Sequence, residues 1–373
     1  MGQTDRFDAL YAEQTGLEDV PIRLDDEVLH AGKFPPLDLW EEGCFVMVGE
    51  SEEHDLFLWT TVYSLKGHGQ GVWMVKDGAE QETLFMAIPK ERRNKGLWDH
   101  DFARTGWHPG RRGQGSDLTV ERDDDKVVWR LGDRQYISAP PVFQVRGSHG
   151  GVDVDITYRQ AAPAFWEWGA FATAAERDRG GYDAMCRVEG TIKAGGETYL
   201  IKKATGIKER ISVGQSSNPI RTLAPPRAMY WLFTMAEQTG VFLFHPGPPG
   251  LDLGTVTDGG RHLLYKPRLG HGDVTLTELE HWHDPRSGLH VPSRWRLNMS
   301  SAEGVVDLDI NSHGRCWFNW VLSEGVRLCA YLLATANGSF TRPDGTTVAF
   351  KDELICVNWL RTYSTWYETL PEG

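Results

Sequence analysis

The chain has 373 residues, of which 40% are hydrophobic and 24% are charged, a composition typical of globular rather than disordered proteins. Its formal net charge of −13 at pH 7, with acidic residues scattered along the chain, argues against a nucleic-acid-binding face and against a polybasic membrane anchor. No apolar run reaches the ~18 residues that a transmembrane helix needs, and no signal pattern opens the sequence, so we expect no membrane span.

The cysteines indicate a reducing compartment. Their number is odd and none of them forms a Cys-x-x-Cys pair, so we expect reduced thiols in a cytoplasmic protein. The residues concerned are Cys44, Cys186, Cys316, Cys329 and Cys356.

The first part of the chain is predicted to form an N-terminal arm over 1–36, with a short amphipathic helix at about 5–14. From Cys44 onward, short β-branched and aromatic runs alternate with turns. A long polar loop over 89–116 interrupts them. It holds the cluster Trp98-Asp99-His100-Asp101, which would either close over a pocket or simply be solvated. The strands predicted in this part are 44–48, 56–65, 71–75, 83–88, 117–122, 127–131, 152–158, 165–172, 183–193 and 197–205.

A proline-rich stretch over 219–227 is the best candidate for a linker between domains. We therefore place one domain at 37–218 and a second at 219–373. The second domain continues the alternation of short strands and turns and has no convincing long helix. Eight to ten short strands in each part predict an all-β protein built from barrels or sandwiches.

The two parts resemble each other in sequence. Val152-Asp153-Val154-Asp155-Ile156 recurs as Val306-Asp307-Leu308-Asp309-Ile310, about 150 residues later, and a repeat of that length suits a duplicated domain. Other segments recur in the same order: Leu118-Thr119 as Leu276-Thr277, Trp129-Arg130-Leu131 as Trp295-Arg296-Leu297, Trp166 and Trp168 as Trp317 and Trp320, and Gly190-Thr191-Ile192 as Gly338-Ser339-Phe340.

A hairpin of the form Val188-Glu189-Gly190 … Gly195-Gly196-Glu197-Thr198-Tyr199, followed by Gly206-Ile207-Lys208-Glu209-Arg210, resembles the lipocalin-like carotenoid hydratase (hydroxyneurosporene synthase) and AttH-like family. The family's Trp-Gly pair after this segment is absent here, where Val213 precedes Gly214. The resemblance implies two tandem lipocalin-like (calycin-type) antiparallel β-barrel domains related by internal duplication. It also implies relatives that hydrate isoprenoid double bonds or cyclise polyenes.

The spacing between two of the repeated landmarks is longer in the second copy, and the extra residues fall within 278–293. This segment gathers His281, His283 and Asp284 around Trp282. Two His residues one apart on a strand have a spacing known for zinc or iron ligands. Strand alternation, however, places Asp284 and Glu280, the candidates for a third ligand, on the opposite face, so metal binding is the less favoured alternative. We expect a protein that needs no cofactor.

The same residues suit acid–base chemistry on an apolar substrate. A buried carboxyl group has a raised pKa and donates a proton near neutral pH, and aromatic faces stabilise a carbocation. The expected proton-transfer residues are Glu209, Asp284 and His281. The expected substrate-binding residues are Trp282, Trp166, Trp168, Tyr230, Trp231 and His283.

The function that follows from the sequence is a cofactor-independent lyase or isomerase. It would add or remove water on a hydrophobic isoprenoid alcohol or alkene, in an aromatic pocket between the two domains. Two alternatives remain open: a non-catalytic carrier of an apolar small molecule, and a polyene cyclase. The expected partner is a hydrophobic small molecule, and the sequence leaves the oligomeric state open.

Overall fold

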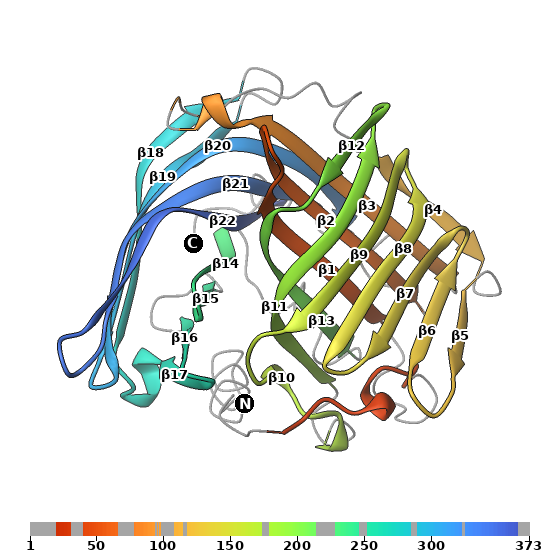
Figure 1. Cartoon of the computed structure of the whole chain (residues 1–373), viewed down its shortest axis with the longest axis horizontal. Helices are drawn as coiled ribbons and strands as arrows, with labels where there is room; N and C mark the ends of the chain where they lie inside the picture. The colour runs from red at the N-terminus through yellow and green to blue at the C-terminus, as the bar shows by residue number, and fades with distance from the viewer. Residues whose placement is uncertain are drawn as a thin grey trace, which may run out of the picture.

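The computed structural model is built almost entirely of antiparallel strands arranged in two curled sheets (Figure 1). Its described residues contain 3₁₀ turns but no α-helix, which confirms the predicted all-β class of two lipocalin-like barrels. In this part of the chain no helix is long and apolar enough to cross a bilayer. The structure describes residues 20–30, 40–65, 78–93, 95, 97, 108–114, 118–173, 179–213, 228–245, 252–284, 289–322 and 325–364.

The first sheet has the strand order β4-β3-β2-β1-β13-β11-β9-β8-β7-β6-β5, and both β10 and β12 pair with β11. Its strands are β1 (Trp40–Glu50), β2 (His54–Leu65), β3 (Gly78–Pro89), β4 (His108–Gln114), β5 (Thr119–Arg122), β6 (Val127–Leu131), β7 (Arg134–Ala139), β8 (Val142–His149), β9 (Val152–Gln160), β10 (Phe165–Gly169), β11 (Arg179–Ala194), β12 (Glu197–Leu200) and β13 (Lys203–Val213).

The second sheet has the order β17-β16-β15-β14-β22-β21-β20-β19-β18. Its strands are β14 (Ala228–Ala236), β15 (Thr239–His245), β16 (Leu253–Asp258), β17 (Arg261–Tyr265), β18 (Asp273–His283), β19 (His290–Ser301), β20 (Gly304–Leu322), β21 (Gly325–Thr341) and β22 (Thr347–Ser364). The 3₁₀ turns are η1 (Leu24–Asp26), η3 (Lys90–Arg92), η5 (Phe171–Thr173) and η6 (Pro267–Leu269).

The strand orders support the predicted duplication. The path β4-β3-β2-β1-β13-β11-β9-β8-β7 has the same connectivity as the whole second sheet, and the first sheet continues beyond it with β6 and β5. The repeated pentapeptides lie in β9 and β20, which are equivalent strands in the two paths. Trp166 and Trp168 lie in β10, and Trp317 and Trp320 lie in the second half of β20. These segments correspond, because β9 and β10 together pair with β11 in the way that the single long strand β20 pairs with β21.

Two of the other sequence matches are wrong. Trp129-Arg130-Leu131 lies in β6, three strands from β9, whereas Trp295-Arg296-Leu297 lies in β19, next to β20. The same mismatch separates Thr119 in β5 from Thr277 in β18. The extra length deduced between these landmarks is therefore not an insertion, because β18 and β19 simply form a long hairpin.

The remaining predictions on the fold have mixed outcomes. The loop prediction over 89–116 is wrong at His108–Gln114, which forms β4 despite its Gly, Pro and Arg residues. The strands β7 and β8 were not predicted. The helix at 5–14, the strand at 71–75, the cluster Trp98–Asp101 and the linker at 219–227 lie outside the described residues, so the domain boundaries stay predictions.

Strand alternation sorts the apolar residues into three clusters. One fills the interior of the first barrel and a second fills the interior of the second barrel. The third joins the outer faces of the two sheets, and we call it the inter-sheet interface. On β1, for example, Phe45 and Met47 point into the first barrel, whereas Cys44, Val46 and Val48 face the second sheet.

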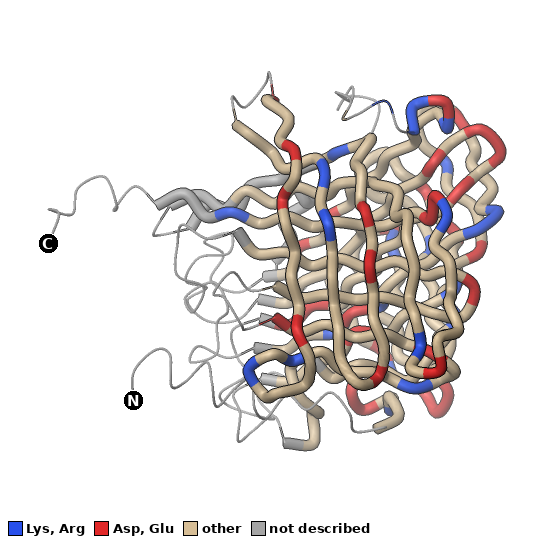
Figure 2. Tube along the Cα trace, turned by 90° about the vertical axis from the view of Figure 1, so that its left-hand side faces the viewer, with Lys and Arg blue, Asp and Glu red and all other residues tan. Residues whose placement is uncertain are grey.

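Aromatic and polar contacts tie the sheets together across this interface. Tyr331 of β21 packs against Phe57 and Trp59 of β2, with ring centroids 5.4 and 5.3 Å apart. The buried His313 ring lies 3.0 Å from a carboxylate oxygen of Asp55 on the other sheet. Figure 2 shows charged residues of both signs spread over the described strands and turns.

Two equivalent glycines allow β11 and β21 to lie close to their neighbours. Gly190 and Gly338 have φ values of 135° and 147°, and a Cβ atom at either would lie 2.1 or 2.0 Å from the carbonyl oxygen of Asp155 or Asp307.

We expect Gly190→Ala to lower the free energy of unfolding by about 2 to 3 kcal/mol in urea titrations. Gly196→Ala is the matched control, because Gly196 also has a positive φ but nothing lies within 4 Å of the place a Cβ atom would take. An equal loss in both variants would contradict the close-approach argument.

Candidate active site

Strand β13 carries three consecutive charged residues, Lys208-Glu209-Arg210, whose side chains alternate between two environments. Lys208 lies over the rings of Phe45 and Tyr182, which line the first barrel interior, at 5.4 and 5.0 Å from their centroids. The Glu209 side chain points away from the first barrel interior and faces the inter-sheet interface, where Ile207 also lies. The backbone of one strand therefore separates two buried cations from a carboxyl group.

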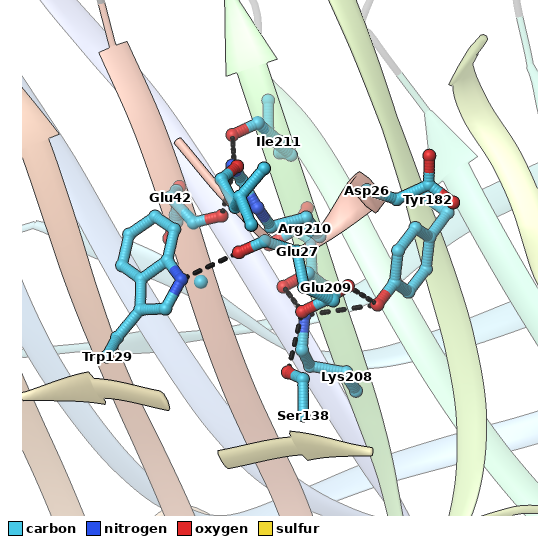
Figure 3. A network of polar contacts seen from close by, with 12 residues as sticks. Asp26, Glu27, Glu42, Trp129, Ser138, Tyr182, Lys208, Glu209, Arg210 and Ile211 are labelled. Carbon is cyan, nitrogen blue, oxygen red and sulfur yellow. Dashed lines mark hydrogen bonds and ion pairs between the residues drawn. The ribbon is translucent and has the colours of Figure 1, made fainter. Parts of the chain in front are cut away.

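The Lys208 charge is compensated by Glu27, an acidic residue from the described segment 20–30 (Figure 3). Glu27 forms an ion pair with Lys208 at 3.2 Å and accepts hydrogen bonds from Ser138 at 2.6 Å and from Tyr182. Its carbonyl oxygen accepts a bond from Trp129 Nε1 at 2.7 Å. Burial opposes ionisation of Glu27, but the Lys208 and Arg210 charges outweigh it, so its pKa lies below the ordinary value.

Arg210 is held in a similar way. Its guanidinium donates to the Glu41 carboxylate and to the Val28 carbonyl, the latter at 2.8 Å, and stacks over the Trp129 ring at 4.9 Å. Burial raises the pKa of Glu41, but the Arg210 charge outweighs this and the pKa is lowered. Burial lowers the pKa of Lys208, and the negative charge of Glu27 opposes this. The first barrel interior is thus an internally paired network that holds the segment 20–30.

On the other face of β13, neighbouring strands bring acidic groups together. Glu209 pairs in register with Cys44 of β1 and with Asp183 of β11. Ligand atoms of Glu42, Cys44 and Glu209 lie within 4.8 Å of one another. We call Glu42 and Glu209 the carboxyl pair.

The carboxyl pair has strongly raised proton affinity. Burial raises the pKa of Glu42 to about 7, although Thr61 donates a hydrogen bond of 2.8 Å to it. Burial, together with the negative charges of Asp183 and Glu42, raises the pKa of Glu209 well above its ordinary value. Two carboxyl groups this close cannot both ionise easily, so the pair holds at least one proton at neutral pH.

Aromatic side chains surround this pair. Trp59 and Tyr63 come from β2 and Tyr331 from β21, all in the cluster that contains Cys44. Burial, and next the negative charge of Glu42, raises the pKa of the Tyr63 hydroxyl well above its ordinary value. The pair therefore lies between the two sheets, in surroundings that are apolar and aromatic.

The structure places the predicted site residues at three locations. Glu209 and Trp231 face the inter-sheet interface. Trp166 is in the first barrel interior, where its Nε1 donates to the Val20 carbonyl, and Trp168 is half-buried on the same strand. The remaining residues belong to the second barrel: Tyr230, His281, Trp282, His283 and Asp284.

In the second barrel the predicted residues form three small groups. Asp284 is buried and accepts a bond of 2.7 Å from Arg315, which lies over the Trp282 ring at 4.6 Å. His281 and Tyr230 both bind Glu278, and the exposed His283 ring lies 5.1 Å from His290. Asp284 is therefore engaged in an internal ion pair, and the prediction that these residues line one pocket with Glu209 is not what the structure arranges.

Sequence reasoning missed three residues of this site: Glu42, Cys44 and Asp183. The predicted strand began at Cys44, whereas β1 begins at Trp40 and includes Glu42. Extending the alternation backward from Val48 and Val46 through Cys44 would have placed Glu42 on the same buried face. An acidic residue at a buried strand position was the available signal.

Within the described residues, Glu42, Cys44 and Glu209 are close enough to hold a metal ion together. Metal binding requires deprotonated ligands, and burial raises the pKa of all three groups. A cation would therefore have to displace protons from each of them. The arrangement suits proton transfer better than metal binding.

No protein-family model and no curated protein sequence matches the chain. Solved structures do match. A structure named as a putative AttH from Nitrosomonas europaea has a TM-score of 0.54 at 12% identity, covering 91% of this chain and 98% of that one. CghA with Sch210972 has a TM-score of 0.56 at 12% identity, covering 94% and 97%. Kievitone hydratase from Nectria haematococca is a more distant match, with a TM-score of 0.48 at 12% identity, covering 91% and 94%. Identities this low establish the fold alone: the chain has the two-domain lipocalin-like fold of the AttH-like structures.

Proposed function

We propose that the protein is a cofactor-independent lyase that adds or removes water on a hydrophobic isoprenoid alcohol or alkene. The observation that carries the proposal is the carboxyl pair Glu42–Glu209, buried among aromatic side chains between the sheets, with one pKa at about 7. A group with that pKa is half protonated at neutral pH, which is the condition for efficient general acid–base catalysis. The five free, buried cysteines support a reducing compartment, and we propose the cytoplasm.

The chemistry needs only these side chains and the substrate. In dehydration, the protonated carboxyl group gives its proton to the hydroxyl oxygen, the C–O bond breaks and water leaves. The resulting carbocation loses a proton from the adjacent carbon to the ionised carboxylate, and an alkene forms. Trp59 and Tyr331 offer π faces that stabilise the cation, and hydration is the same sequence in reverse. A carrier would need the apolar walls but not the carboxyl pair.

The test is turnover of a panel of isoprenoid alcohols and alkenes by the wild type, Glu42→Gln and Glu209→Gln. We expect kcat to fall at least about 100-fold in both variants, because the proton donor or acceptor is lost while the shape is kept. Glu189→Gln is the control, since Glu189 lies on β11 but forms an exposed ion pair with Arg159. Asp284→Asn and His281→Gln test the other two proton-transfer residues that the sequence predicted. Wild-type turnover in both carboxyl-pair variants would remove the assignment.

A further inference from the structure

A row of three polar or amphipathic residues crosses the second sheet on its interface side. Trp231 of β14 pairs in register with Asn358 of β22, and Asn358 pairs with Tyr331 of β21. Trp231 and Tyr331 belong to the inter-sheet cluster, as do Cys356 and Leu360, which flank Asn358 on the same face of β22. The row is thus part of the wall that faces the first sheet.

Two atoms in this row are buried without a hydrogen-bond partner among the described residues. They are Trp231 Nε1 and Asn358 Oδ1, and each side chain is only 8% exposed. Buried polar groups are nearly always paired, and leaving one unpaired costs about 1 to 3 kcal/mol. One is a donor and the other an acceptor, on neighbouring strands. A hydroxyl group, which both donates and accepts, would satisfy both atoms at once.

The third member of the row connects it to the carboxyl pair. The Tyr331 ring stacks on Trp59, and its hydroxyl group is close enough to Cys44 and Glu42 to interact with them electrostatically. The first-sheet side of the interface is acidic, with Glu42, Glu209 and Asp183 on it. An anionic group bound there would oppose the ionisation of the carboxyl pair that acid–base chemistry needs, whereas a neutral alcohol would not.

We propose that Asn358 and Trp231 bind the hydroxyl group of a neutral alcohol substrate: Asn358 Oδ1 accepts a hydrogen bond from the hydroxyl group, and Trp231 Nε1 donates one to the hydroxyl oxygen. This rests on the proposed function, because it names the group on which the carboxyl pair acts. It makes Asn358 and Trp231 specificity-determining residues that select alcohols over hydrocarbons and over anionic esters of the same carbon skeleton.

The experiment measures binding by calorimetry, with farnesol, farnesene and farnesyl diphosphate as probes. The wild type is expected to bind farnesol more tightly than either of the other two. In Asn358→Leu and in Trp231→Phe, the Kd for farnesol should rise about 10-fold, the loss of one hydrogen bond, while that for farnesene stays unchanged. Thr335→Val is the control, because Thr335 Oγ1 is also buried without a partner among the described residues but lies four residues from Tyr331 along β21.

Three results would overturn the inference: farnesol binding by Asn358→Leu at the wild-type Kd, an equal loss of farnesol and farnesene binding, or diphosphate bound as tightly as the alcohol. Selective alcohol binding without turnover would support the inference and contradict the lyase. If turnover were lost in Glu209→Gln but unaffected in Asn358→Leu, the lyase would be supported and the alcohol-binding inference would be contradicted.

Discussion

Replacing Glu27 with alanine is expected to lower the free energy of unfolding by about 3 to 5 kcal/mol, the effect of removing one partner from a buried ion pair. Glu27 is 2% exposed and its partner Lys208 is 1% exposed, so the ammonium group would be left in the first barrel interior without its counterion. The variant also loses the acceptor for Ser138 and Tyr182. Urea denaturation monitored by tryptophan fluorescence measures the change.

The double variant Glu27→Met/Lys208→Met separates the charge from the packing. Because both charges are removed together, it should recover most of the stability that the single variant loses. Ser138→Ala is the small-effect control, with an expected loss of about 1 kcal/mol for one hydrogen bond. If Glu27→Ala were no worse than Ser138→Ala, the ion pair would not be what holds the segment 20–30 in the barrel.

The fold was predictable from the sequence as far as local patterns determine it. Alternating apolar residues in 152–156 and 306–310 predicted strands, and the repeated pentapeptide found an equivalent pair, β9 and β20. The Trp-Arg-Leu match failed because the same residue types recur in non-equivalent strands such as β6 and β19. Strand order is a non-local property, and a three-residue match does not specify it.

The sequence predicted one of the two residues of the carboxyl pair. Glu209 was identified through the segment Gly206–Arg210. Its partner Glu42 lies far from it in the sequence, because most strands of the first sheet come between them along the chain. The register that places Cys44 beside Glu209 is set by β1 and β13, the first and last strands of that sheet along the chain. No spacing along the chain reveals such a contact, which is why the histidines near Trp282, adjacent in sequence, were predicted instead.

The structure also links the two faces of β13. Burial raises the pKa values of Glu42 and Glu209, and the Lys208 charge on the far side of the strand offsets only part of this rise. Glu27 neutralises Lys208 by direct pairing. The paired interior of the first barrel therefore leaves little positive charge to stabilise carboxylates at the interface. This explains how acidic groups keep their protons beside a strand that carries two buried cations.

The second large effect is a pH-dependent loss of stability that Glu42→Gln should remove. The pKa of Glu42 rises from 4.5 to about 7 on folding, so the folded state binds more protons than the unfolded state between these values. The stabilisation is complete below pH 4.5 and is lost as the pH rises through 7. A rise in the pKa of this size corresponds to a loss of about 3 kcal/mol in the free energy of unfolding between pH 4.5 and pH 7.

Urea titrations of the wild type and Glu42→Gln at intervals from about pH 4.5 to about pH 8 test this. The two proteins should be similar in stability at the acidic end, where Glu42 is protonated and uncharged like an amide. The variant should be the more stable by up to about 3 kcal/mol at the alkaline end. Glu27, Glu41 and Asp55 have lowered pKa values, so they add stability with rising pH only below their unfolded values and cancel in the comparison. Parallel stability curves for the two proteins would mean that Glu42 is already ionised when folded. Glu42 would then hold no proton to donate at neutral pH, and the acid–base chemistry would depend on the proton of Glu209 alone.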